Sequence, residues 1–141
     1  MENNSKHKTM NILLYIWQLP QTLLGYVLLL FWKQTGVLEY KGKTVRICKT
    51  FPGGISLGYV IILDTYPYSK DTWNDVKHEY GHSIQSERWG WLYLLVIGLP
   101  SLIGNIWDRL FHSKWDIQRA NEWYYNQPWE KGADKLGGVE R

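Results

Sequence analysis

Residues 89–107 read WGWLYLLVIGLPSLIGNIW, and the path of this uncharged stretch decides the fold of the chain. As one straight helix its nineteen residues would reach about 28 Å, a minimal membrane span. Its middle holds Gly98, Pro100 and Gly104, residue types that favour a turn or a break. Split there, each arm reaches about 12–14 Å, less than half the hydrocarbon thickness. We therefore predict a re-entrant or monotopic helical hairpin, with a single kinked span as the alternative.

A second uncharged block, Ile12–Trp32, lies near the start of the chain. Gln18-Leu19-Pro20-Gln21 interrupts it, and because proline removes a backbone donor, we predict one kinked helix or two short arms. Tryptophan and tyrosine are enriched at membrane–water interfaces, and tryptophans stand at the ends of both blocks: Trp32, Trp89, Trp91 and Trp107. We therefore expect membrane lipid to be a partner.

The remainder of the chain predicts an α+β membrane protein with one domain, residues 1–141. Val37–Tyr40 and Lys43–Cys48 flank a short glycine turn and predict a β-hairpin. Ile55–Leu63 is rich in β-branched residues and predicts a third strand, completing a small antiparallel sheet. Residues 108–125 are predicted to be largely helical, and Pro128–Leu136 forms the last short helix.

His78-Glu79-Tyr80-Gly81-His82 is a candidate metal-binding motif. It lies in a helix predicted to begin at a capping box, Thr72–Asp75, and to end at Gly90. Residues four apart share one helix face, so both imidazoles can bind one ion, with Glu79 beside them. In this pattern zinc activates a water molecule and the glutamate takes its proton. We therefore predict zinc on His78 and His82, with Glu79 as general base.

A catalytic zinc needs a third protein ligand. Gln85 and Arg88 stand where a metzincin has the glycine and histidine of its extended motif, so that arrangement is excluded. A glutamate on a later helix is another solution, and Glu130 is followed four residues on by Asp134. Asp134 would then accept a hydrogen bond from a ligand histidine. Glu122 is the alternative third ligand, without an aspartate four residues later.

HEYGH, an apolar hairpin and a final ExxAD together resemble the membrane gluzincin metallopeptidases that include HtpX and the CAAX prenyl endopeptidase. The stretch from His78 to Gly138 is also similar to short bacterial membrane proteins with an apolar GLPS segment and a final ADxLGG. The resemblance implies that HExxH supplies two zinc ligands and the base. It also implies that Glu130 supplies the third ligand, with Asp134 supporting the site.

This ligand set requires the hairpin, because a single crossing of residues 89–107 would put Glu130 on the far side of the membrane from His78. With a single span, the third ligand would have to come from the same side of the membrane as HExxH, for example Asp64 or Glu87. Basic residues suggest the orientation, since two precede the first block and five closely follow it: Lys6 and Lys8, then Lys33, Lys41, Lys43, Arg46 and Lys49. The positive-inside rule then places the catalytic side in the cytoplasm, at a bacterial inner membrane.

Composition limits the other classes of function. A net charge of +3 without a basic run carrying interleaved aromatics argues against nucleic acid as a partner. The single cysteine, Cys48, excludes an intrachain disulfide. We expect zinc-dependent hydrolysis of a peptide or membrane-protein substrate, with His112, Arg119, Tyr124 and Tyr125 as candidate transition-state donors. The alternative is a non-catalytic membrane protein, such as a partner, chaperone or immunity factor, with a structural or vestigial zinc site.

Overall fold

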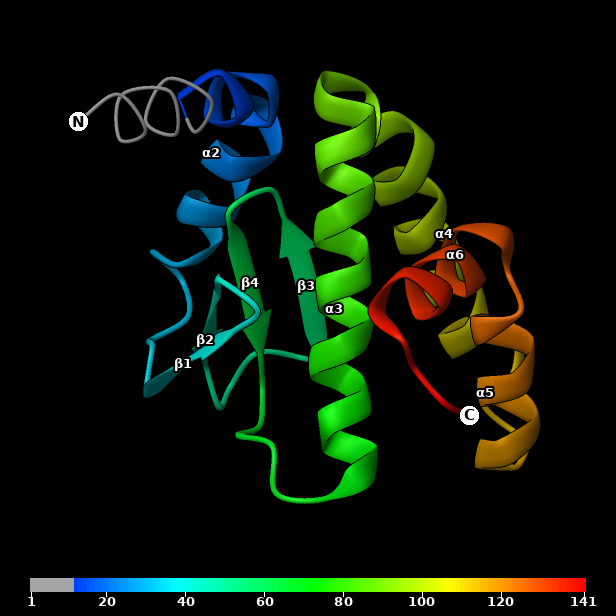
Figure 1. Cartoon of the computed structure of the whole chain (residues 1–141). Helices are drawn as coiled ribbons and strands as arrows, with labels where there is room; N and C mark the ends of the chain where they lie inside the picture. The colour runs from blue at the N-terminus through cyan, green and yellow to red at the C-terminus, as the bar shows by residue number, and fades with distance from the viewer. Residues whose placement is uncertain (1–11) are drawn as a thin grey trace.

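A four-stranded sheet and a long helix lying across it form the centre of the computed structural model, which describes residues 12–141 (Figure 1). The strands are β1 (Gly36–Tyr40), β2 (Lys43–Ile47), β3 (Gly54–Leu57) and β4 (Val60–Leu63), in the order β1-β2-β4-β3. The expected α+β class and the β1–β2 hairpin are confirmed. The sheet is mixed rather than antiparallel, because β2 pairs with β4 in parallel.

The segment predicted as one strand, Ile55–Leu63, is two strands. Gly58 has φ +64°, a conformation that favours glycine, and this reverses the chain between β3 and β4. All four residues of β4 are buried, because the strand is covered on both faces. Val60 and Ile62 pack with residues of the α2 side, whereas Ile61 and Leu63 pack with Val76 of α3. A strand buried on both faces is apolar throughout, so its sequence hides the turn that precedes it.

Helix α3 (Lys70–Trp89) carries the HExxH motif on the other face of the sheet from α2 (Leu19–Leu28). It begins one turn earlier than predicted, because Ser69 is the N-cap and Thr72 completes the capping box. Its predicted end at Gly90 is confirmed. Gly90 has φ +54°, and an added Cβ would lie 2.0 Å from the ring of Trp17, so only glycine fits this reversal.

The predicted hairpin inside residues 89–107 is wrong. After a 3-10 turn, η1 (Gly90–Leu92), the chain is helical from Leu94 to Phe111 through a π-helical turn, η2 (Leu94–Gly98), and α4 (Leu99–Phe111). In η2 the amide of Leu99 bonds to the carbonyl of Leu94, five residues back. This wider turn admits Pro100 at the start of α4 without breaking the helix.

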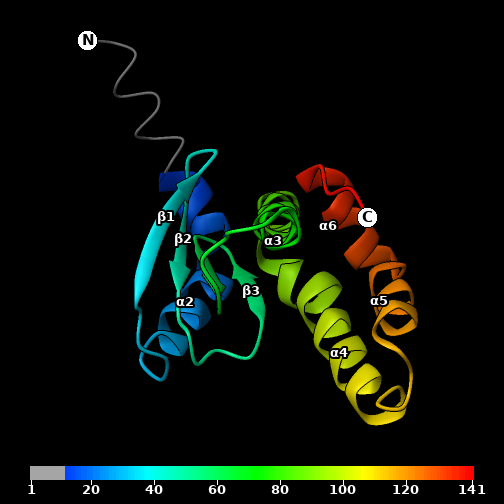
Figure 2. The same cartoon turned by 90° about the horizontal axis from the view of Figure 1, so that it is seen from below.

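The chain nevertheless returns to α3, because it reverses at both ends of this helix instead of in its middle. It turns back at Gly90, runs away through α4, and turns again through residues 112–116. Helices α5 (Ile117–Tyr125) and α6 (Pro128–Gly137) then bring it back, and α6 packs along α3 on the side opposite the sheet (Figure 2). Within the described residues, helix 94–111 alone is long and apolar enough to cross a membrane, and 11% of it is buried.

Candidate metal centre

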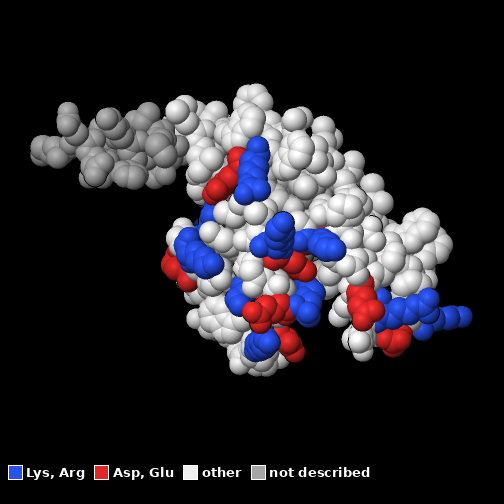
Figure 3. All heavy atoms as spheres, turned by 45° about the vertical axis from the view of Figure 1, so that its right-hand side comes forward, with Lys and Arg blue, Asp and Glu red and all other residues white. Residues whose placement is uncertain are grey.

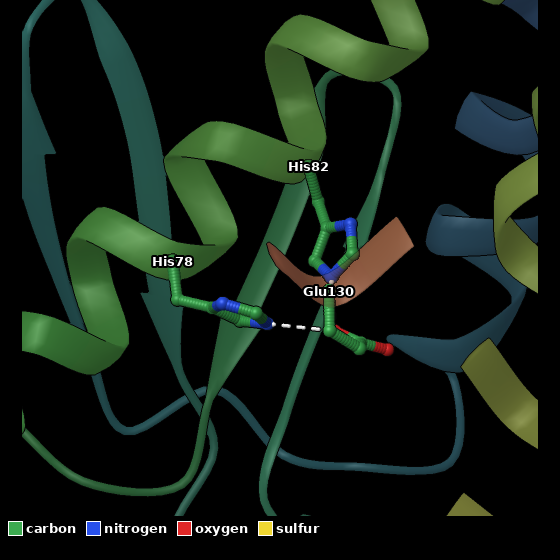
Figure 4. A group of neighbouring side chains, drawn as sticks. All are labelled: His78, His82 and Glu130. Carbon is green, nitrogen blue, oxygen red and sulfur yellow. Dashed lines mark hydrogen bonds and ion pairs between the residues drawn. The ribbon is translucent and has the colours of Figure 1, made fainter. Parts of the chain in front are cut away.

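Three buried side chains from α3 and α6 meet in a group that could hold a metal ion (Figure 4). His78 and His82 project from successive turns of α3, as their spacing requires. Glu130, in the first turn of α6, points between them. Its Oε2 lies 3.0 Å from Nε2 of His78 and 3.0 Å from Nε2 of His82. All the donor atoms of the group lie within 4.8 Å of one another.

The outward nitrogen of His78 is held by Asp134. Its Nδ1 lies 2.7 Å from Asp134 Oδ1, and a carboxylate can only accept, so Nδ1 carries the proton. Nε2 is therefore the nitrogen left for a metal. Arg141 donates from Nε to the other Asp134 oxygen at 2.7 Å and lies over the ring of Tyr125, which in turn packs edge-on against His78. This chain of contacts fixes both the tautomer and the orientation of the imidazole.

His82 is oriented in the same way by a neutral partner, Gln85. The Gln85 amide nitrogen donates to the carbonyl oxygen of Trp129 at 2.9 Å, so its Oε1 faces His82 Nδ1 at 2.7 Å. That oxygen accepts the Nδ1 proton and leaves Nε2 as the available donor atom. Since Trp129 precedes Glu130, one amide side chain ties the position of His82 to the turn that carries the third member of the group.

Electrostatics keeps the group charged although it is buried. Burial lowers the pKa of His78, but the carboxylates of Asp134 and Glu130 outweigh it and raise that pKa to about 9. Burial likewise raises the pKa of Glu130, yet hydrogen bonds from His78 and His82 hold it well below its usual range. The second oxygen of Glu130 accepts a hydrogen bond from the hydroxyl of Ser101 on α4. Glu130 is therefore an anion in which Oε2 faces the two histidines and Oε1 accepts from Ser101.

Glu79 lies beside the group but is not part of it. Burial raises the pKa of its carboxyl, while the two histidines lower it. Oε2 is buried and has no hydrogen-bond partner among the described residues. Gly54 of β3 leaves room for this side chain, because an added Cβ would lie 2.8 Å from Glu79 Oε1. A desolvated carboxylate oxygen with no partner is costly unless another group fills the gap, so this atom marks where a bound species would complete the site.

Two glycines let α3 and α6 approach closely enough for Glu130 to reach the histidines. A Cβ on Gly81, inside the HExxH motif, would lie 1.9 Å from the carbonyl oxygen of Ala133. A Cβ on Gly137 would lie 1.9 Å from the carbonyl oxygen of Lys77. Backbone therefore packs directly on backbone at two points along the helix pair. The glycine of the motif serves the site by this contact and not by any chemistry of its own.

The donor set fits a divalent metal such as zinc. Two imidazoles, each with Nε2 free of its proton, and a carboxylate are three ligands that zinc accepts. Ligand atoms bound to zinc at about 2.0–2.1 Å in tetrahedral geometry lie roughly 3.3 Å apart, close to the 3.0 Å separations between Glu130 and each histidine. Three atoms that can all accept, facing one another in a buried site, repel unless a proton or a cation lies between them.

Other candidate residues from the sequence lie elsewhere. Glu122 is exposed on α5 and accepts a hydrogen bond from Gln118. Glu87, the candidate for a single span, pairs with Lys43. At the end of α4, His112 stacks on Trp115 and donates a hydrogen bond from Nδ1 to Asp108 at 2.9 Å.

Two of the four candidate donors, both tyrosines, are near the ligands. The hydroxyl of Tyr124 lies 3.5 Å from Ser101 Oγ, and burial raises its pKa. Burial also raises the pKa of Tyr125 to about 12, so both hydroxyls stay protonated at neutral pH. Arg119 lies over the ring of Trp115 instead.

Three residues that support the site were not predicted from the sequence: Gln85, Ser101 and Arg141. A signal for Gln85 was present, because it stands three residues after His82 on the same helix face. Ser101 gave no signal, since its contact depends on the unbroken helix through Pro100. Arg141 reaches Asp134 only because the chain folds back after Gly138, which has φ +71°.

Comparison with known proteins identifies no relative: no family model, no curated protein and no solved structure matches the chain. Any functional assignment must therefore come from the site itself.

Proposed function

We propose that the protein is a zinc metalloendopeptidase of the gluzincin type, with His78, His82 and Glu130 as ligands and Glu79 as general base. The observation that carries the proposal is the convergence of two ring nitrogens and a carboxylate oxygen, with the free carboxylate of Glu79 held beside them. Zinc in such a site supplies Lewis acidity, which polarises a carbonyl and acidifies water. The fold has no matched relative, so the proposal rests on chemistry and not on kinship.

Each side chain then has a defined task. Glu79 takes a proton from water and passes it to the leaving amine, a role that a carboxylate with a raised pKa suits near neutral pH. Asp134 and Gln85 hold the two imidazoles with Nε2 free. The protonated hydroxyl of Tyr124, 3.5 Å from Ser101 Oγ, is a candidate for a hydrogen bond to charge that develops on the substrate carbonyl.

Two features offer binding surfaces for a polypeptide. A groove of about 860 Å³ runs between the first turns of α3 and helices α5 and α6, and Tyr125 and Asp134, which contact His78, line it. β3 is the edge strand of the sheet beside Glu79, so an extended peptide could pair with it at Gly54. The groove borders the ligand group through Tyr125 and Asp134, and β3 borders it through Glu79. We propose a peptide or a membrane protein as the substrate.

We place the site at the cytoplasmic surface of a bacterial inner membrane. The apolar helix 94–111 supports a membrane location by its length and composition. The excess of basic residues after the first apolar block supports the cytoplasmic side.

The test is a Glu79→Gln variant in detergent-purified protein, measured for bound zinc and for cleavage of fluorescent casein. We expect one zinc per chain in the wild type and in the variant, with cleavage lost only in the variant. Glu122→Gln is the matched control, because it removes an exposed carboxylate of the same kind, and it should cleave normally. Full activity of Glu79→Gln would refute the mechanism.

The competing proposal is a non-catalytic membrane protein with a structural zinc. One observation favours it: His78, His82 and Glu130 are only 6%, 5% and 0% exposed, so little of the group is open to a substrate. It predicts that wild-type protein binds zinc, that zinc removal unfolds it, and that Glu79→Gln changes neither property. Zinc-dependent cleavage by the wild type decides against it.

A further inference from the structure

Helix 94–111 is apolar on its outer side, and from Ser101 onward its inner side is small or polar, the reverse of a helix on a water-soluble protein. Its most exposed apolar positions are 47–68% exposed: Leu95, Leu99, Leu102, Ile103, Ile106, Trp107, Leu110 and Phe111. Arg109 is an exposed charged residue among them. Its inner positions are apolar near the start, where Ile97 packs with Leu57 and Tyr93, and small or polar farther along: Ser101, Gly104 and Asp108. Apart from Arg109, the outer side is therefore as apolar as a protein core, but no part of residues 12–141 covers it.

The inner side has polar partners. Ser101 donates to Glu130, Gly104 lies against the ring of Trp129, and Asp108 accepts from His112 at 2.9 Å. The same helix thus contributes a hydrogen bond to the candidate metal ligand and presents an apolar surface on its other side.

A second apolar surface adjoins the first. The outer side of α2 exposes Leu23, Leu24 and Val27, and Leu30 and Phe31 follow it. Leu28 and Leu94 pack in one cluster, so α2 and the start of helix 94–111 are neighbours, and Figure 2 shows them on the same side of the molecule. Charged side chains gather over the lower part of the view in Figure 3, below a broad uncharged surface. So large an exposed apolar area marks an interaction surface.

Charges at the ends of these helices suit an anionic partner. Four basic residues there form no ion pair within residues 12–141: Lys33, Arg88, Arg109 and Lys114. The nearby acidic residues already have partners: Glu87 pairs with Lys43, Asp108 accepts a hydrogen bond from His112, and Asp116 accepts one from the amide of Arg119. Free cations beside an uncharged apolar surface with tryptophan at its margins match the headgroups and acyl chains of an anionic leaflet.

A transmembrane path for the helix conflicts with its neighbour α5. The two helices pack together, and α5 exposes Gln118, Arg119 and Glu122. If helix 94–111 crossed the bilayer along its axis, these side chains would enter the hydrocarbon, where charged groups are strongly disfavoured. Lying in the plane, the helix buries only its outer side and leaves α5 and α6 in water. Arg109, near the end of the apolar side, can extend its long side chain to the headgroups.

We propose that helix 94–111 lies in the plane of one anionic membrane leaflet, with its outer side and that of α2 in the lipid and its inner side holding Glu130 through Ser101. The zinc site of the proposed function then lies just above the lipid surface. The in-plane position of the helix is argued from its exposed apolar side and the free basic residues. Only the statement that the zinc site lies above the lipid rests on the proposed function.

The deciding experiment labels single cysteines in a Cys48→Ser background with a membrane-impermeant maleimide. Arg88→Cys and Ser113→Cys flank the helix, and Lys135→Cys on α6 reports the side of the metal centre. Spheroplasts and inverted inner-membrane vesicles are labelled in parallel. We expect all three positions to react in the same preparation and to be protected in the other. Reaction of positions 88 and 113 in opposite preparations would show a crossing helix and overturn the proposal.

The lipid itself is tested by flotation of purified protein with vesicles of phosphatidylcholine, with or without phosphatidylglycerol. The double substitution Arg109→Gln and Lys114→Gln should weaken binding to the anionic vesicles about fivefold per charge and leave binding to phosphatidylcholine unchanged. Equal binding of the wild type to both vesicles would refute an anionic leaflet. A soluble oligomer that binds neither would show that a second copy covers the surface. Zinc content of each variant reports separately on the metal site.

Discussion

Substitution of Gly81 by alanine tests whether the helix contact builds the site. The new methyl carbon would lie 1.9 Å from the carbonyl oxygen of Ala133, whereas ordinary contact begins at 3.4 Å, so α6 must retreat by about 1.5 Å. Zinc–ligand distances tolerate about ±0.2 Å. Glu130, three residues before Ala133 on the same helix, would therefore leave the reach of an ion held by His78 and His82.

The expected loss of zinc affinity exceeds the roughly 10–100-fold that follows loss of a supporting hydrogen bond, because a ligand itself is displaced. Overpacking should also lower the free energy of unfolding by about 1–3 kcal/mol, equivalent to roughly 4–12 °C in Tm for a domain of this size. Competition with a chromophoric zinc chelator measures the affinity, and circular dichroism measures the melting temperature of the metal-free protein.

Gly104→Ala is the matched control, since its methyl would meet only Trp129, at 3.9 Å. It should bind zinc like the wild type, and alanine should favour its helix. If Gly81→Ala kept wild-type zinc affinity and melting temperature, then the contact between α3 and α6 would not position Glu130, and the explanation of the motif's glycine would be wrong.

Three further predictions concern the supporting residues. Gln85→Leu should lower zinc affinity about 10–100-fold, because His82 loses the hydrogen bond that keeps the proton on Nδ1 and Nε2 available for the metal. Chelator competition measures the affinity, and an unchanged affinity would contradict the assigned hydrogen bonds. Ser101→Ala should lower it about tenfold without changing vesicle flotation, whereas a joint loss of both properties would indicate unfolding of α4. In the metal-free protein the pKa of His78 is raised to about 9, so its stabilising charge is fully present below about pH 6.5 and is lost as pH rises through about 9. Tm should accordingly fall across that interval, and Asp134→Asn should flatten the dependence; a flat wild-type profile would refute the charged pair.

Local spacing predicts the parts of the site that lie on single helices. His78 and His82 share a face because they are four residues apart, and the same spacing relates Glu130 to Asp134. The structure brings Glu130 to the two histidines, and Asp134 to His78, across two intervening helices. The sequence alone left Glu122 open as a ligand, because the direction in which α5 faces depends on packing that no local pattern encodes.

Long-range features account for the incorrect predictions. Pro100 favours a break, but the π-helical turn before it absorbs the missing hydrogen bond, so the helix continues. The β-branched run Ile55–Leu63 hides a reversal at Gly58, where Thr22 of α2 packs so closely that a Cβ would lie 2.1 Å from its hydroxyl. The residue pattern shows neither outcome, because the first depends on backbone hydrogen bonding in η2 and the second on the packing of α2 against the turn at Gly58.

The contact between α3 and α6 also bears on the order in which the molecule comes apart. Helix α5 has no buried residue, so the segment from α5 to α6 is attached mainly where α6 packs along α3, through the two glycine contacts, the ligand group and the hydrogen bonds of Gln85 and Asp134. Such a segment opens at a lower free energy than the sheet, and its amides should exchange with deuterium first. A metal ion that binds only the closed segment raises the free energy of opening. The increase grows with the logarithm of the free metal concentration divided by the dissociation constant. Metal supply would thereby set how much of the chain behaves as one cooperative unit.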